Sequence, residues 1–166
     1  GKIKAQLLGS GSILREAIAA AELLKKDFNV DCDIWSCPSF TELKREGQSV
    51  QRFNRLNPSK KPKVSYIEKC LDKTVGPVIA VSDYMHDFVE QIRPWVKADY
   101  STLGTDGFGR SDTREQLRSF FEVDSKHIAF TTVTALVKSG DLPKSALAKA
   151  LKLYEIDASL PDPVGV

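Results

Sequence analysis

Hydrophobic and polar residues follow two different periods along the chain, and together they predict a mixed α/β fold. Residues 4–8 are typical of a strand, and apolar positions then recur at helical spacing over residues 14–28. Residues 31–36 alternate, as in a half-exposed strand, whereas residues 78–81 are continuously apolar, as in a strand covered on both faces. With a fourth strand at residues 100–103, we expect the sheet order second, first, third, fourth, with the third strand central and the second at an edge.

The connection between the second and third strands, residues 38–71, is too long for a simple loop. Breaks are expected at Gly47 and at Asn57-Pro58, which divide it into three short helices. The helical stretches lie around residues 40–45, 50–56 and 66–71.

The second half of the chain is predicted to be helical apart from the fourth strand and a tail. Ser82 or Asp83 is expected to cap a helix that Pro94 ends. We interpret His86, near the start of that helix, as a solvated surface group, because no nucleophile is placed beside it. A helix capped by Asp124 and a final helix that opens near residue 143 follow.

The stretch between the fourth strand and the next helix, residues 102–114, is the strongest candidate for a functional surface. A helix is expected from about Thr113, with Asp112 as its N-cap in a capping box. The stretch follows a strand, and open α/β sheets place functional loops at the carboxyl ends of their strands. Its tip is apolar and surrounded by charged residues, a composition that favours contact with another domain or subunit over exposure to solvent. A loop that only connects two elements is the alternative. The candidate interface residues are Asp106, Phe108, Arg110, Asp112 and Arg114.

Within this loop, Phe108 is expected to pack against a neighbouring domain or subunit of a larger protein. Arg110 is expected to pair with a carboxylate, either Asp106 or Asp112 in the loop or one across the interface.

Composition narrows the class of protein. The 166 residues fit one domain, and the net charge of +2 provides no overall field to recruit nucleic acid. The lysines at positions 60, 61 and 63 are interpreted as a solvated loop. No apolar run approaches the roughly 20 residues that cross a bilayer, so we expect no membrane association. The chain starts without methionine and its first strand begins almost at once, which predicts a piece of a longer protein.

The three cysteines are Cys32, Cys37 and Cys70, an odd number without metal-ligand spacing. Unpaired thiols favour a reducing compartment, and we expect the cytoplasm. Alternation places Cys32 on one face of the edge strand with Ile34, so it is predicted to be a buried, slowly reacting thiol.

Motifs that carry chemistry are missing from the sequence: there is no nucleophile elbow, no Walker loop and no histidine pair at metal spacing. The turn at residues 9–12 precedes a helix, as in dinucleotide-binding folds, but Leu14 stands where the fingerprint needs its third glycine. A structural turn is favoured, and a free-standing nucleotide-binding or protein-docking module remains the alternative function.

Six stretches of the sequence are specific enough to be compared with known families: residues 7–12, 39–47, 52–58, 76–80, 83–85 and, with the highest specificity, 103–114. Together they resemble the carboxyl-terminal domain of the homodimeric, thiamine-diphosphate-dependent pyruvate dehydrogenases. The resemblance implies a transketolase-like third domain, an α/β three-layer sandwich whose mostly parallel sheet can include one antiparallel strand and has helices on both faces. We assign residues 1–156 to this domain and residues 157–166 to a flexible tail.

The resemblance further implies an enzyme that decarboxylates pyruvate and reductively acetylates the lipoyl carrier of an acyltransferase component. Thiamine diphosphate and magnesium belong to the parent enzyme, where a Gly-Asp-Gly motif and a downstream Asn-Asn pair hold them. Here the chain reads Thr105-Asp106-Gly107 and has no asparagine after Asn57. We therefore expect no catalytic, cofactor-binding or metal residue in this chain. Its expected partners are the other domains, the second subunit and the acyltransferase, with neither nucleic acid nor membrane.

Overall fold

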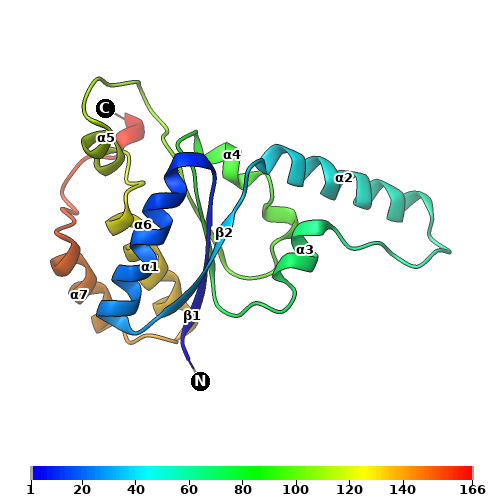
Figure 1. Ribbon diagram of the computed structural model, residues 1–166, viewed down its shortest axis with the longest axis horizontal. Coiled ribbons are helices and arrows are strands. Elements are labelled where there is room, and N and C mark those ends of the chain that lie inside the picture. The colour runs from blue at the N-terminus through cyan, green and yellow to red at the C-terminus, as the bar shows by residue number, and fades with distance from the viewer. Residues whose placement is uncertain (1, 166) are drawn as a thin grey trace.

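A single four-stranded sheet forms the centre of the computed structural model, which describes residues 2–165 (Figure 1). Its strand order is β2-β1-β3-β4, with β3 inside and β2 at an edge, which confirms the predicted topology. All three pairings in the described residues are parallel, so the antiparallel strand that the resemblance allowed is not found there. The strands are β1 (Lys4–Gly9), β2 (Asp31–Ser36), β3 (Val78–Val81) and β4 (Tyr100–Leu103).

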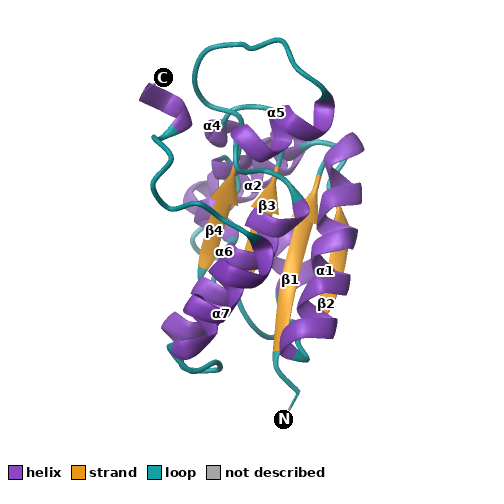
Figure 2. Cartoon of the chain, turned by 90° about the vertical axis from the view of Figure 1, so that its left-hand side faces the viewer, coloured by secondary structure: helices purple, strands orange, loops and turns teal. Residues whose placement is uncertain are grey.

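Three helices cover one face of the sheet, as Figure 2 shows. Their apolar residues join Leu7 and Ile79 from the strands in a fully buried core. The predicted cap of α6 is confirmed, because the Asp124 carboxylate accepts a hydrogen bond from the His127 backbone N–H at 2.9 Å. The helices are α1 (Leu14–Phe28), α6 (Ser125–Ser139) and α7 (Ser145–Tyr154).

The opposite face carries a second core, in which Phe40 and Trp95 pack against Leu8 and Val78. Its helices are α2 (Phe40–Leu56), α3 (Tyr66–Leu71), α4 (His86–Glu90) and a 3₁₀ turn at Arg93–Trp95. Helices on both faces make the three layers that the sequence predicted.

The break predicted at Gly47 is wrong, because α2 runs without interruption to Leu56. Gly47 is buried against Trp95, and a Cβ there would lie 2.7 Å or less from three atoms of the indole ring. The glycine therefore serves close packing between a helix and a ring. The second predicted break is confirmed, since the helix ends immediately before Asn57.

The segment after β3 also differs from the prediction. α4 starts only at His86, and neither Ser82 nor Asp83 caps it. The Ser82 hydroxyl instead accepts a hydrogen bond from the Tyr84 backbone N–H at 3.0 Å, and the Asp83 carboxylate is bound to other side chains. The Tyr84 carbonyl accepts from the Thr105 backbone N–H at 2.8 Å, which holds this segment out of helical geometry.

Residues 104–113, between β4 and the next helix, form a loop that we call the central loop. The helix after it, α5 (Arg114–Phe120), begins where the sequence predicted, but its cap is Thr113 rather than Asp112. The Thr113 hydroxyl accepts from the Gln116 backbone N–H at 3.3 Å. The Asp112 carboxylate accepts from the Thr113 backbone N–H at 2.7 Å, so it fixes the turn that precedes the cap.

A fully buried amide, Gln6 in β1, joins its strand to β2 and to the segment that precedes β3. Its Nε2 donates to the Asp33 carboxylate and to the Val75 carbonyl, both at 3.0 Å. Its Oε1 accepts from the Trp35 indole N–H at 2.9 Å. Every polar atom of this side chain thus has a partner.

The end of the described chain returns to the central loop. Residues Pro163–Gly165 form a 3₁₀ turn, and a Cβ at Gly107 would collide with the Pro163 carbonyl. The flexibility predicted for this tail stays a prediction. Among the described residues, no helix combines the length and apolar character needed to cross a membrane.

Candidate functional site

The loops that follow β3 and β4 meet at the carboxyl end of the sheet, where the central loop, residues 104–113, arches over α4 and α5 (Figure 2). Gly104 is buried at its base, and a Cβ there would lie 2.5 Å from the backbone nitrogen of His86. The Thr105 hydroxyl donates to the Asp83 carbonyl at 2.9 Å. The start of the loop is therefore fastened to the β3–α4 connection.

Asp106 continues this attachment. Its carboxylate accepts from the His86 backbone N–H, at 3.2 Å to each oxygen, and is also in contact with the His86 ring Nδ1. The His86 side chain is 41% exposed, which agrees with its interpretation as a solvated surface group, but its ring also has an unpredicted partner in a loop carboxylate 20 residues away. The Asp106 side chain points into the base of the loop rather than to the surface.

Beyond Asp106 the loop is open to solvent. The Phe108 side chain is 77% exposed, and Tyr84 and Met85, on the segment to which the loop is fastened, are 65% and 57% exposed. Several large apolar side chains exposed at one end of a molecule mark an interaction surface.

Arg110 lies over an aromatic ring instead of beside a carboxylate. Its guanidinium carbon is 4.1 Å from the centre of the Phe120 ring, a cation–π distance. Among residues 2–165 it forms no ion pair with Asp106 or Asp112, so the predicted pairing within the loop is wrong. Pairing across an interface stays a prediction. Asp112 and Arg114 are exposed at the distal end of the loop.

A buried arginine under the loop was not predicted. Arg118 of α5 donates to the carboxylates of Glu16 at 2.9 Å and Asp83 at 3.1 Å, and to the Ser12 hydroxyl at 3.0 Å. The other Glu16 oxygen accepts from the Ser125 backbone N–H at 3.0 Å. These bonds join the β1–α1 turn, the β3–α4 connection, α5 and α6. The available signal was that Arg118 stands three residues before Phe121, which places the two on the same side of the helix.

The Arg118 network occupies the point between β1 and β3 at which the strand order reverses. Doubly wound α/β proteins bind nucleotides in this crevice, where backbone N–H groups at a helix start receive phosphate. Here the crevice holds a guanidinium together with two carboxylates, Glu16 and Asp83, that repel a phosphate. The geometry thus favours the structural interpretation of the turn at residues 9–12.

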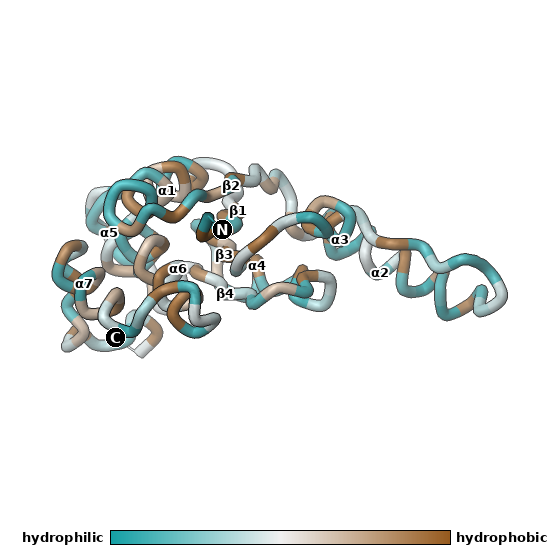
Figure 3. Tube along the Cα trace, turned by 90° about the horizontal axis from the view of Figure 1, so that it is seen from below, coloured by the Kyte–Doolittle hydropathy of each residue, from teal (hydrophilic) through white to brown (hydrophobic). Residues whose placement is uncertain are grey.

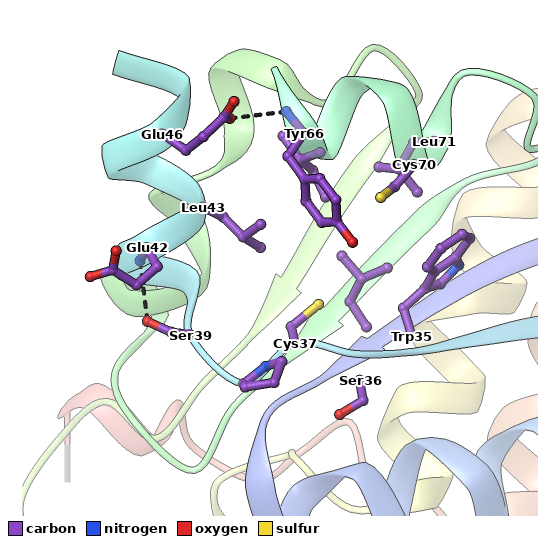
Figure 4. A pocket seen from close by; sticks show the side chains of 13 residues that line it. Trp35, Ser36, Cys37, Ser39, Glu42, Leu43, Glu46, Tyr66, Cys70 and Leu71 are labelled. Atoms are coloured by element: carbon purple, nitrogen blue, oxygen red, sulfur yellow. Dashed lines mark hydrogen bonds between the residues drawn. The ribbon is translucent and has the colours of Figure 1, made fainter. Parts of the chain in front are cut away.

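A hollow of about 500 Å³ lies between the end of β2, α2 and α3 (Figure 4). Trp35, Leu43 and Leu71 contribute to its apolar wall. Glu42 points away from it in Figure 4, and the Glu46 carboxylate accepts from the Tyr66 backbone N–H at 2.9 Å. The hollow therefore offers apolar surface and no free charge.

Two of the cysteines, Cys37 and Cys32, do not add reactive groups. Burial, reinforced by the nearby Cys70, raises the pKa of Cys37 to about 12, so this thiol stays protonated at neutral pH. Cys32 is half-buried, and burial followed by Asp33 and Asp31 raises its pKa to about 12. No cluster of three or more His, Cys, Asp or Glu side chains suited to a metal occurs within residues 2–165.

Comparison with known proteins places the chain in a family. A family model described as "Transketolase-like TK C-terminal domain" matches residues 1–124. The pyruvate dehydrogenase E1 components of Cupriavidus necator, Pseudomonas aeruginosa and Escherichia coli K12 are 53%, 52% and 48% identical over 96% or more of the chain. The chain spans 18% of the length of these relatives.

A solved structure supports the fold. The "Split gene transketolase, inactive beta4 tetramer" aligns with 82% of this chain and 40% of its own, with a TM-score of 0.53 and 13% identity. Sheet order, layers and family model agree, and the chain therefore belongs to the transketolase-like C-terminal domain family.

Proposed function

We propose that this chain is the C-terminal domain of a pyruvate dehydrogenase E1 component that decarboxylates pyruvate and reductively acetylates a lipoyl carrier. The identity of 48–53% to proteins of that name, over nearly the whole chain, supports the assignment. Three free cysteines favour the reducing cytoplasm as its compartment.

Within the enzyme, the domain forms an interface and supplies no catalytic residue. The observation that carries this proposal is the exposed Phe108 on a loop whose base is fixed by Thr105 and Asp106. A fixed loop presents its apolar tip in one geometry, which lowers the entropic cost of docking. Phe108, Arg110, Asp112 and Arg114 would face a neighbouring domain or the second subunit, while Asp106 anchors the loop.

The cofactor of the parent enzyme is placed outside this chain. Thiamine diphosphate needs a magnesium ion bound by oxygen ligands, and the carboxylate of the Thr105-Asp106-Gly107 sequence is already held by His86. This arrangement does not fit the group, and no catalytic residue is assigned here. The purified 166-residue chain should therefore release no carbon dioxide from pyruvate in the presence of thiamine diphosphate and magnesium. Measurable decarboxylation would contradict this assignment.

Replacing Phe108 with alanine tests the interface. Burial of a phenylalanine side chain is worth roughly 1.5–3 kcal/mol, so dimerisation or domain docking of the full-length enzyme should weaken by about 10- to 100-fold. The melting temperature of the 166-residue chain should barely change, because the ring is exposed there. Leu153→Ala, on the exposed side of α7, is the matched control and should leave both properties unchanged. A destabilised chain with an unaffected full-length dimer would reject the interface.

The alternative function, a nucleotide-binding module at residues 9–12, is tested by thermal shift with NAD, ATP, FMN and thiamine diphosphate. A ligand at 100 times its dissociation constant stabilises by about 2.7 kcal/mol, which shifts melting by several degrees. No shift is expected, because Arg118 fills the crevice. A reproducible shift with one nucleotide would favour the alternative.

A further inference from the structure

The part of the chain farthest from the central loop is a projecting arm, which we define as residues 47–65. It comprises the distal part of α2 and the segment that leads to α3, and Figures 1 and 3 show it extending away from the rest of the molecule. It contains no acidic residue. Its cationic residues are Arg52, Arg55, Lys60, Lys61 and Lys63.

These five cations have no anionic partner within the described residues. All five side chains are exposed, and none takes part in an ion pair there. The chain holds 24 basic and 22 acidic residues, so 19 basic and 22 acidic residues remain outside the arm. The positive charge of this protein is therefore concentrated on one projection of a body with a net negative charge.

The arm is held in one conformation by its own contacts. The Asn54 side chain donates to the Lys63 carbonyl at 2.9 Å and accepts from the Lys63 backbone N–H at 2.8 Å, which ties the returning segment to α2. The Asn57 side chain donates to the Phe53 carbonyl at 2.8 Å and closes the end of the helix. The ammonium of Lys63 lies 3.8 Å from the centre of the Phe53 ring. An element ordered in this way pays little entropy on binding.

Apolar side chains stand among the charges. Leu56 is 55% exposed and Val64 is 44% exposed. Aliphatic groups beside cations match a protein surface that offers carboxylates around an apolar patch. Nucleic acid is a poorer match, because the one aromatic ring in the arm, Phe53, is half-buried and has two lysines over it.

We propose that the arm docks on a carboxylate-bearing surface of the longer polypeptide, outside residues 1–166. The relatives of this chain are more than five times its length, since it spans 18% of them, so most of the surface available to the arm lies beyond it. The inference rests on the proposed function only in requiring that longer polypeptide, whatever its reaction. It concerns the opposite end of the domain from Phe108.

Zero-length cross-linking of the full-length protein tests the proposal. A water-soluble carbodiimide joins a lysine ammonium to a carboxylate in contact with it, and peptide mass spectrometry then identifies both residues. We expect Lys60, Lys61 or Lys63 to be joined to aspartate or glutamate outside residues 1–166. Cross-links from these lysines only to carboxylates inside residues 1–166, or none at all, would overturn the proposal.

Charge reversal gives the second measurement. The double variant Arg55→Glu, Lys61→Glu should lower the yield of Lys60 and Lys63 cross-links about tenfold, as expected when like charges face each other across an interface. The control Lys73→Glu reverses an exposed loop lysine outside the arm and should leave the yield unchanged. An equal yield in all three proteins would refute docking through charge.

Binding of a duplex DNA probe tests whether the partner of the arm is nucleic acid instead of protein. If Lys60, Lys61 and Lys63 form no cross-links while the full-length protein binds duplex DNA and the double variant does not, the arm is a nucleic-acid element and the proposal fails. Retained cross-links with an ineffective Phe108→Ala would reject the interface loop alone, so the two proposals fail separately.

Discussion

Replacing Arg118 with methionine tests the network under the central loop. Methionine keeps much of the apolar stem and removes the guanidinium, which leaves the carboxylates of Glu16 and Asp83 facing each other without a cation. The Arg118 side chain is only 10% exposed, and those of Glu16 and Asp83 are 23% and 39% exposed.

The expected loss of stability follows from this exposure. Removing one partner of a fully buried ion pair costs about 3–5 kcal/mol. Because water reaches Asp83, screening lowers the expected cost to about 2–3 kcal/mol. With a denaturant slope of about 1–3 kcal/mol per molar urea, the unfolding midpoint of the 166-residue chain should fall by about 0.7–3 M, as measured by circular dichroism.

Arg114→Met is the matched control, four residues earlier on the same helix but exposed, and it should change stability by no more than about 0.5 kcal/mol. A double-mutant cycle with Glu16→Gln should show a coupling of about 1–3 kcal/mol. If Arg118→Met costs no more than Arg114→Met, or if the cycle is additive, the network does not hold the carboxyl end of the sheet together.

Three further predictions concern other parts of the domain. Gly47→Ala should destabilise the chain by about 1–3 kcal/mol in urea despite the better helix propensity of alanine, because its Cβ meets Trp95; a gain in stability would contradict the packing explanation. Burial raises the pKa of Cys37 to about 12, above the unfolded value near 8.5. The contribution of the buried, protonated Cys37 thiol to the free energy of unfolding is therefore fully present below about pH 8.5. That contribution should be lost by up to about 1.4 kcal/mol per pH unit as pH rises from 8.5 toward 12, and urea unfolding at pH 8, 9 and 10 should show a smaller decline in Cys37→Ala. The raised pKa of Cys32 should make its labelling by a thiol reagent at pH 8 at least about tenfold slower than that of a free thiol, and equal rates would disprove its protection.

The strand order could be predicted from the sequence because the order of apolar and polar residues within a strand indicates whether one or both of its faces are buried. Residues 78–81 lack polar positions and lie at the centre, whereas residues 31–36 alternate and lie at the edge. A parallel sheet with connecting helices leaves few other orders for four strands with these burial patterns.

The remaining features depend on partners distant in sequence. Gly47 has the local character of a helix break, and only Trp95, 48 residues later, makes it a packing position. Arg118 is separated from Glu16 by 102 residues, so no local spacing could indicate their contact. The exposed tip at Phe108 could be predicted because an apolar residue between glycines is unusual in a loop. The domain or subunit expected to cover it stays a prediction.

The buried Gln6 amide affects which alignments the sheet tolerates during folding. If β1 slid by one residue against its neighbours, its side chains would exchange faces and the Gln6 amide would lose the Trp35, Asp33 and Val75 groups that satisfy it. An unsatisfied buried amide costs roughly 1–3 kcal/mol, whereas an aliphatic side chain would tolerate the slip more easily. Gln6→Leu should lower the free energy of unfolding by about 1–3 kcal/mol, because the Trp35 indole N–H and the Val75 carbonyl lose their partner, and it should also admit misaligned strand pairings. This one polar side chain therefore contributes to the uniqueness of the strand alignment as well as to stability.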